Sequence, residues 1–182
     1  MNESAFNKFY WGFLFVMIDF RLQGIDVLPD IIGYLLFAGG FSLLASSSSR
    51  FEKAKNLNVF MIVLSIFQIY ETPAQGSGIN FGVLGPFGFL IGIAAAILNL
   101  IVIYNLFMGI RDIANLQGKM SIGQEAEKKW SHYLLLQLSV FIAIVLIIIP
   151  PIAFIFVIGI FICSIVLTFT IMSFIKSCGS SL

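Results

Sequence analysis

Charged residues are scarce in this 182-residue sequence. It has ten Lys or Arg and nine Asp or Glu, so its charged fraction is 10%, against about 25% in an ordinary soluble domain. With 59% hydrophobic residues, a water-soluble fold would expose more apolar surface than a soluble monomer normally tolerates. Disordered chains are rich in charge and poor in aromatics, and a net charge of +1 gives no basis for binding nucleic acid. The composition therefore predicts an all-α integral membrane protein.

Cysteine and histidine are also rare. Cys163 and Cys178 lie in one apolar helical segment, roughly 22 Å apart along its axis, which excludes a disulfide. His132, the one histidine, lies beside Trp130 and Tyr133, a pair typical of a membrane interface. The sequence has no metalloprotease, hydrolase or phosphate-binding motif and no intramembrane aspartate dyad. We therefore expect no cofactor and no metal, and an enzyme is the least supported class.

Long apolar runs are abundant instead. A spanning helix needs about 20 apolar residues, and the pattern predicts a polytopic bundle of six transmembrane helices in one domain. Capping boxes beginning at Ser49 and Ser121 start the third and fifth helices, whereas Pro86 and Pro150 divide runs too long for one span. Residues 79–85 are expected to form an interfacial loop or a partial re-entrant turn. The predicted spans are residues 5–22, 27–45, 50–71, 86–110, 124–149 and 152–175.

The basic residues predict which way the protein faces. With a cytoplasmic N-terminus and six spans, only Arg21 falls on the outer side, as the positive-inside rule requires. A count of five or seven spans would divide the basic clusters between the two sides. We therefore expect both termini in the cytoplasm. The residues predicted to lie inside are Lys8, Arg50, Lys53, Lys55, Arg111, Lys119, Lys128, Lys129 and Lys176.

The few charges left on the outer side form the main candidate site. They are Asp19, Arg21, Asp26, Asp30 and Glu71. Asp19 is expected at the hydrocarbon edge unless Lys8 snorkels, and an ionisable residue there is a functional candidate. The functional interpretation is an acidic vestibule that attracts a cationic solute. The structural interpretation is a capped helical hairpin, in which Asp26 caps the second helix, Asp30 lies in its first turn, and Arg21 pairs with one of the two.

Small residues along the fourth span predict close helix packing, because they let helices approach one another in lipid. Asn99 at the end of this stripe is expected to form an interhelical hydrogen bond or to contact a substrate. Other polar residues, such as Gln68, Asn105 and Gln137, would line a pore only if several of them converged. The residues of the stripe are Gly85, Gly88, Gly92, Ala96 and Asn99.

The N-terminal part of the chain carries a pattern of its own. Residues Tyr10–Gly12, Asp19–Arg21 and Gly24–Tyr34 resemble a group of small, uncharacterised multi-pass membrane proteins of Gram-positive bacteria. The resemblance implies a bacterial plasma membrane and no particular activity. In size and in its predicted topology, the chain is also similar to the membrane-embedded vitamin-binding subunits of bacterial energy-coupling transporters, a likeness of architecture alone.

Two classes of function are consistent with these features. The first is a protein that handles a small solute or ion, as a channel, a transporter or the substrate-binding subunit of one. The alternative is an accessory or assembly subunit of a membrane complex without transport of its own. The expected partners are the lipid bilayer, a small cationic solute, and a membrane-protein partner or a second copy of the chain.

Overall fold

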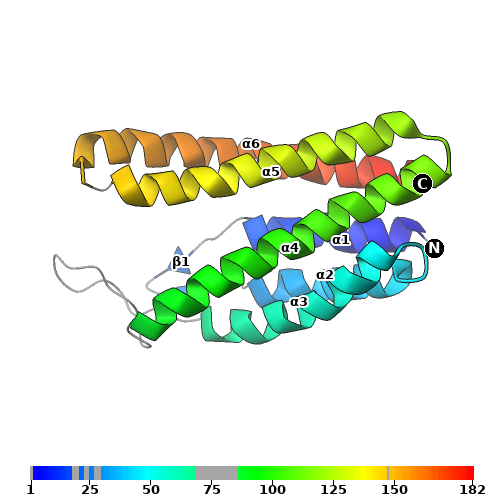
Figure 1. Ribbon diagram of the computed structural model, residues 1–182, viewed down its shortest axis with the longest axis horizontal. Helices are drawn as coiled ribbons and strands as arrows, with labels where there is room; N and C mark the ends of the chain where they lie inside the picture. The colour runs from blue at the N-terminus through cyan, green and yellow to red at the C-terminus, as the bar shows by residue number, and fades with distance from the viewer. Residues whose placement is uncertain (1, 18–20, 23–24, 27–29, 69–85, 147) are drawn as a thin grey trace.

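The computed structural model describes residues 2–17, 21–22, 25–26, 30–68, 86–146 and 148–182. These residues form six α-helices and a two-stranded antiparallel ribbon (Figure 1). The predicted all-α class is confirmed. The elements are α1 (Asn2–Met17), β1 (Arg21–Leu22), β2 (Ile25–Asp26), α2 (Asp30–Leu44), α3 (Ser49–Gln68), α4 (Pro86–Leu116), α5 (Met120–Leu146) and α6 (Pro150–Ser181).

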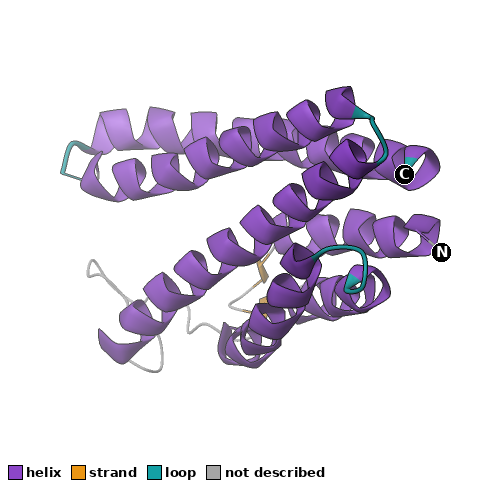
Figure 2. Cartoon of the chain, turned by 45° about the vertical axis from the view of Figure 1, so that its right-hand side comes forward, coloured by secondary structure: helices purple, strands orange, loops and turns teal. Residues whose placement is uncertain are grey.

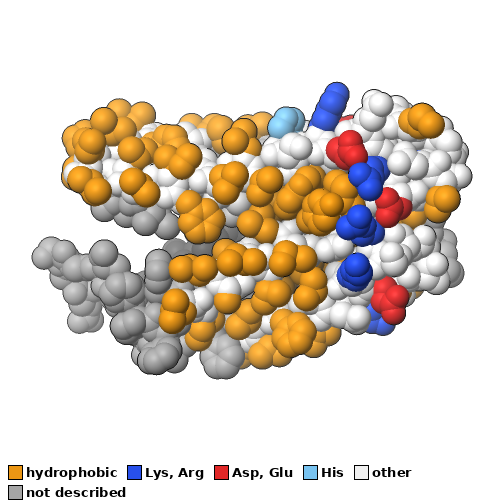
Figure 3. All heavy atoms as spheres, in the orientation of Figure 1, with side chains coloured by type: hydrophobic (Ala, Val, Ile, Leu, Met, Phe, Trp, Pro, Cys, Tyr) orange, Lys and Arg blue, Asp and Glu red, His pale blue; other side chains and the backbone are white. Residues whose placement is uncertain are grey.

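The helices pack as a closed ring. Each helix packs against the next one along the chain, and α6 packs back against α1. Successive helices alternate in direction, so both termini, the α2–α3 turn and the α4–α5 turn lie at one end of the molecule (Figures 1 and 2). We call this the basic end, because Lys and Arg side chains form a band close to it (Figure 3). The alternation that the predicted topology requires is therefore present.

Helix boundaries follow the predicted prolines, but several helices begin or end elsewhere than predicted. Pro86 begins α4 as predicted, whereas α6 begins at Pro150, two residues before the predicted start. Ser48, rather than Ser49, caps α3, because its Oγ accepts a hydrogen bond from the Arg50 backbone N–H at 3.2 Å. The fourth helix runs past residue 110 to a left-handed turn at Gly118, whose φ is 72°. The fifth helix consequently begins before the predicted capping box.

The connection between α1 and α2 differs from the predicted helical hairpin. Arg21 lies opposite Asp26 in the antiparallel ribbon, and Leu22 lies opposite Ile25. Asp26 therefore lies in β2 instead of capping the second helix, and α2 begins at Asp30. The ribbon is favoured physically because its strands satisfy each other's backbone polar groups, which unpaired turns cannot do inside a bundle.

The first two helices are about half as long as α4 and α6. They have 16 and 15 residues, whereas α4 and α6 have 31 and 32. Gly179 of α6 lies against Phe6 near the start of α1, and Met17 at the other end of α1 lies beside Ile160 of α6. From there α6 continues back to its own start at residue 150, about 15 Å further along its axis. The ribbon that follows α1 therefore lies well inside the length of the bundle.

Phenylalanine side chains fill the ring near its basic end. We call this cluster the aromatic plug. Its members are fully buried and come from the first four helices, and neighbouring ring centroids lie 5.0–6.4 Å apart. Edge-on and tilted contacts of this kind add to the stability that burial gives. The plug comprises Phe9, Phe13, Phe37, Phe41, Phe51 and Phe107.

The face of the molecule seen in Figure 3 is largely apolar beyond the charged band. Large hydrophobic side chains are exposed on every helix, from Trp11 on α1 to Phe154 on α6. Within the described residues, Leu90–Leu116 and Pro150–Ser181 are long and apolar enough to cross a membrane. The other helices are shorter or begin with charged turns, so the six-span topology stays a prediction.

Candidate functional site

Polar side chains from three helices lie close together inside the ring, at the level where α1 ends and α2 begins. Asn99 of α4 donates a hydrogen bond from Nδ2 to the Tyr133 hydroxyl group at 2.8 Å. Gln137 of α5 hydrogen-bonds the same hydroxyl group, and the charge of Asp30 acts on the hydroxyl groups of both Tyr34 and Tyr133. We call these five residues the interior polar cluster.

Helical spacing explains how each helix presents its pair of polar groups. Asp30 and Tyr34 lie four residues apart on α2, and Tyr133 and Gln137 lie four residues apart on α5. Residues at this spacing share one face of a helix. α4 packs against α5, and Asn99 on α4 reaches Tyr133 across that contact. Asp30 on α2 acts on Tyr133 electrostatically from within the ring.

The cluster is rich in hydrogen-bond acceptors that lie away from water. Tyr34 and Tyr133 are 3% and 1% exposed. The Asn99 Oδ1 atom is buried and has no hydrogen-bond donor among the described residues. The same holds for Oδ1 of the nearby Asn58, whose Nδ2 donates to the Tyr34 carbonyl oxygen at 2.7 Å. A buried acceptor without a donor costs about 1–3 kcal/mol, so a ligand that brings N–H groups or positive charge would be stabilised here.

A cavity of about 290 Å³ reaches the cluster from the side. Gln137 belongs both to the cavity wall and to the cluster. The remaining wall is mostly apolar and comes from the end of α1 and the middle of α5 and α6, including Met17, Val140 and Phe161. Its polar side chains are Gln137, which joins it to the cluster, and Ser164. A mostly apolar wall with a few polar groups is the usual composition of a small-molecule site, and this volume suits a small solute.

The members of the predicted outer charge cluster do not form one site among the described residues. Asp19 and Glu71 lie outside the described residues. Arg21 and Asp26 occupy opposite positions of the ribbon, and the ion pair of Arg21 with Asp26 or Asp30 stays a prediction. Asp30 lies in the first turn of α2, as predicted, but there it belongs to the interior polar cluster.

Tyr133 is buried inside the ring, although the sequence suggested only an interfacial role. The sequence predicts an interfacial aromatic pair, whereas Tyr133 is buried and lies about 20 Å along α5 from its start at Met120. Trp130 is half-buried and its ring stacks beside Tyr133. His132 is exposed, as expected of a solvated side chain. An amphipathic ring suits an interior hydrogen bond as well as an interface, and the interfacial depth of the pair stays a prediction.

The small-residue stripe of the fourth span has mixed surroundings. Gly85 lies outside the described residues. A Cβ atom at Gly92 would meet no atom within 4 Å, so Gly92 makes no close helix contact in the described part of the chain. Ala96 is half-buried. Asn99 forms the interhelical hydrogen bond that the sequence predicts.

Close glycine packing occurs between α1 and α2 instead. A Cβ atom at Gly33 would lie 2.5 Å from Val16 Cγ2 and 2.8 Å from the Gly12 carbonyl oxygen. A Cβ atom at Gly12 would lie 2.5 Å from the Phe37 ring. Both distances are shorter than van der Waals contact, so these two helices approach as closely as they do only because glycine occupies both positions.

Ion pairs join the helices at the basic end. Arg111 pairs with Glu127 at 2.8 Å and with Asp112 at 3.3 Å. Glu125 pairs with Lys129 one helical turn further on, as the four-residue spacing favours, with Oε1 and Nζ 3.3 Å apart. These exposed pairs contribute little to stability. Within the described ranges, no group of three or more His, Cys, Asp or Glu residues could hold a metal ion.

Sequence reasoning found Asp30, Asn99 and Gln137 as separate polar residues, but it missed Tyr34 and the meeting of all five. The sequence signal that could have predicted the pairs was the four-residue spacing of polar residues on two apolar helices.

In comparisons with known proteins, no family model matches this chain, and no curated protein and no solved structure matches it.

Proposed function

We propose that this chain is a six-span protein of a bacterial plasma membrane that binds a small cationic or amine-bearing solute in the interior polar cluster and takes part in its movement across the membrane. The observation that carries the proposal is the convergence of Asp30, Asn99 and Tyr133 inside a ring whose outer surface is apolar.

The exposed apolar surface supports the membrane setting. Side chains such as Phe60 on α3, Leu135 on α5 and Phe154 on α6 are 60%, 67% and 69% exposed. Burial of apolar surface contributes about 25 cal/mol per Å², so this ring is stable in lipid and prone to associate in water. The short ribbon is compatible with this setting only inside the ring, because non-helical backbone at membrane depth must be surrounded by protein or line an aqueous cavity.

The chemistry of the cluster supports a cationic or N–H-bearing solute. Asp30 supplies a carboxylate, and Asn99 supplies a buried amide oxygen without a donor among the described residues. The tyrosine rings add faces that attract cations. A neutral solute without donors would leave these acceptors unsatisfied, and an anion would be repelled by Asp30.

The aromatic plug supports access from one side. It fills the ring between the polar cluster and the basic end, and Phe37 of the plug lies one turn from Tyr34 with ring centroids 6.3 Å apart. A solute would therefore enter from the end opposite the basic end, which is the outer side in the predicted topology. Movement onward would require the plug residues to separate, as in alternating access.

The proposal is tested by binding measurements on the protein in lipid nanodiscs. The probes are K⁺, methylammonium, guanidinium and choline, each titrated calorimetrically. We expect at least one of them to bind and Asp30→Asn, alone or with Asp19→Asn, to weaken that binding about tenfold or more, the usual effect of removing a charged partner. Glu125→Gln is the matched control and should leave binding unchanged. Binding of no probe, or equal binding by wild type and Asp30→Asn, would contradict the proposal.

The alternative is an accessory or assembly subunit, and one observation favours it. Only 11% of the most apolar part of α6 is buried within the chain, so this helix has a large face for a partner helix or a second copy. The two functions separate experimentally, because an assembly subunit would be recovered with a stoichiometric partner after mild extraction and would bind none of the four cations.

A further inference from the structure

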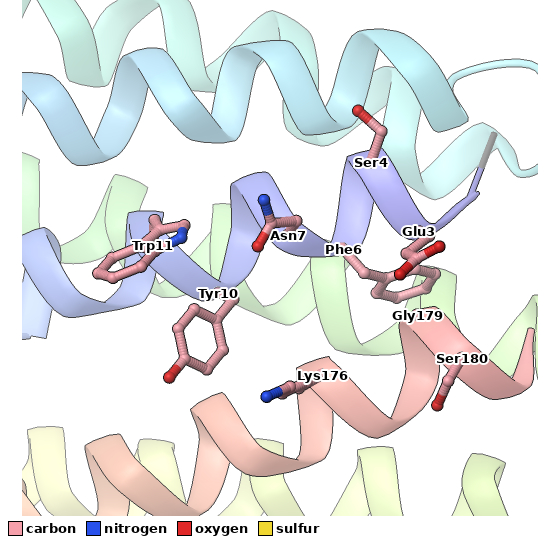
Figure 4. A pocket seen from close by; sticks show the side chains of 9 residues that line it. All are labelled: Glu3, Ser4, Phe6, Asn7, Tyr10, Trp11, Lys176, Gly179 and Ser180. Carbon is pink, nitrogen blue, oxygen red and sulfur yellow. The ribbon is translucent and has the colours of Figure 1, made fainter.

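A cavity of about 710 Å³ lies between the start of α1 and the end of α6 (Figure 4). Gly179 allows the two helices to touch at its edge, since a Cβ atom there would lie 3.0 Å from Phe6 Cβ. Beside this contact, Tyr10 and Lys176 project into the space between the helices (Figure 4). The cavity is separate from the interior polar cluster, which lies on α2, α4 and α5.

The lining residues follow a definite order along the two helices. Trp11 and Tyr10 lie furthest from the chain ends, Lys176 lies beyond them, and Glu3 and Ser180 lie nearest the ends (Figure 4). The distance from Tyr10 to Glu3 along α1 is about 10 Å. Tyrosine and tryptophan are typical of the level where hydrocarbon meets headgroups. The order therefore runs from the apolar belt of the molecule to the water at its basic end.

The charges of this groove match a zwitterion. Lys176 brings one positive charge and Glu3 one negative charge, and neither has an ion-pair partner among the described residues. A phospholipid in the adjoining leaflet presents its acyl chains, its phosphate and its headgroup amine in the same order. Its phosphate would reach Lys176, and its ammonium group would continue to Glu3.

We propose that the groove between α1 and α6 binds a phospholipid with a primary-amine headgroup, with its phosphate at Lys176 and its ammonium group at Glu3. This inference rests on the membrane placement in the proposed function, although not on cation binding. A primary ammonium group can donate hydrogen bonds to the Glu3 carboxylate, whereas the quaternary amine of a choline lipid cannot and a glycerol headgroup carries no positive charge. Trp11, at 46% exposed, leaves the groove open toward the lipid.

The test is lipid retention measured by native mass spectrometry. The full-length protein is reconstituted with equal amounts of phosphatidylethanolamine, phosphatidylcholine and phosphatidylglycerol of the same acyl chains, then extracted in mild detergent. We expect the ethanolamine lipid to be retained preferentially. Lys176→Gln should lower its retention about tenfold. Glu3→Gln should remove the preference, so that ethanolamine and glycerol lipids are retained equally.

Controls separate this proposal from others. Lys128→Gln removes an exposed lysine near the same end and should leave retention unchanged, and thermal unfolding of each variant confirms that it is folded. Soluble phosphoethanolamine should not displace the lipid, because the acyl chains contribute to binding. Asp30→Asn should retain the lipid normally, so a failure of cation binding does not affect this result. Equal retention of all three lipids by wild type, or equal losses with Lys128→Gln and Lys176→Gln, would overturn the proposal.

Discussion

Tyr133 links most of the polar groups inside the ring. Its hydroxyl group accepts a hydrogen bond from Asn99, is hydrogen-bonded by Gln137 and lies within the electrostatic influence of Asp30. In a low-dielectric interior such bonds are individually stronger, and an unpaired member is costly. The Asn99 amide donates from Nδ2 to this hydroxyl group. Its Oδ1 atom has no partner among the described residues, so loss of the tyrosine hydroxyl group would remove a contact that Asn99 does not replace elsewhere.

This dependence leads to a double-mutant prediction. Tyr133→Phe and Asn99→Leu should each destabilise the protein, and the double variant should lose less than the sum of the two. The coupling should be about 0.6–1.7 kcal/mol, the range found for hydrogen bonds between membrane helices. The measurement is reversible unfolding in mixed micelles.

The control for this cycle is Asn105→Leu. Asn105 is buried and donates to the Ile101 carbonyl oxygen of its own helix at 2.8 Å, so its effect should add to that of Tyr133→Phe. A coupling near zero between Asn99 and Tyr133, or an equal coupling for Asn105, would show that the hydrogen bond contributes nothing specific.

Single polar residues could be predicted from the sequence, but their convergence could not. Asn99 and Gln137 stand out in apolar runs and were candidates for that reason. Whether they meet depends on the rotation of α4 and α5 about their axes, which is set by packing across the whole ring. Tyr34 does not stand out in the same way, because an aromatic residue in an apolar helix is usually interpreted as part of the hydrophobic core.

At the scale of elements, the pair of α1 and α2 is the most closely packed. Glycine at positions 12 and 33 removes the side chains that would hold the helices apart. Close approach increases van der Waals contact, which is a main source of helix association in lipid. The pair is therefore sensitive to the addition of a single methyl group.

We predict opposite effects for two glycine substitutions. Gly33→Ala should lower the free energy of unfolding by about 1–3 kcal/mol, because the added Cβ atom would overlap Val16 and the Gly12 carbonyl oxygen. Gly92→Ala adds the same methyl group where no atom lies within 4 Å, and it should be neutral or stabilise by about 0.5–1 kcal/mol through helix propensity. The measurement is the thermal unfolding temperature of the two variants in one detergent. Equal shifts in that temperature would refute the prediction.

Element boundaries could be predicted where a residue forces them. Pro86 and Pro150 lack a backbone N–H and so begin helices. The N-cap of α3 was predicted one residue too late, since consecutive serines at residues 46–49 offer several equivalent caps. The end of α4 was predicted too early, because the helix continues beyond the apolar run to the left-handed turn at Gly118. The ribbon was missed because strands of two residues have no periodicity to detect.

At the scale of the molecule, the charged band is the feature that relates the fold to the membrane. The nine basic residues predicted to lie inside occur in the helix turns and connection nearest the basic end. A ring with an odd number of spans could not bring them together in this way. The orientation itself is a prediction, and the exposed turns at the two ends allow it to be tested.

Cysteine labelling in intact cells tests the orientation. In a Cys163→Ser background, Ser47→Cys lies in the turn at the basic end and Ile148→Cys in the turn at the opposite end, where Ile148 is 84% exposed. A membrane-impermeant maleimide should label Ile148→Cys in intact cells and Ser47→Cys only after lysis. The background protein controls for the buried Cys178, and the reverse pattern would refute a cytoplasmic basic end.

Closure of the ring between α6 and α1 also has a consequence for the order of synthesis. α1 leaves the ribosome well before α6, so its contacts with α6 do not exist until α6 is made. At translation rates of about 5–20 residues per second, this interval is on the order of ten seconds. During that time α1 depends on its contacts with α2, namely the close glycine packing and the phenylalanine rings that the two helices share. A chain that stops before residue 150 would leave α1 exposed along its α6 face, available to the proteases that remove incomplete proteins.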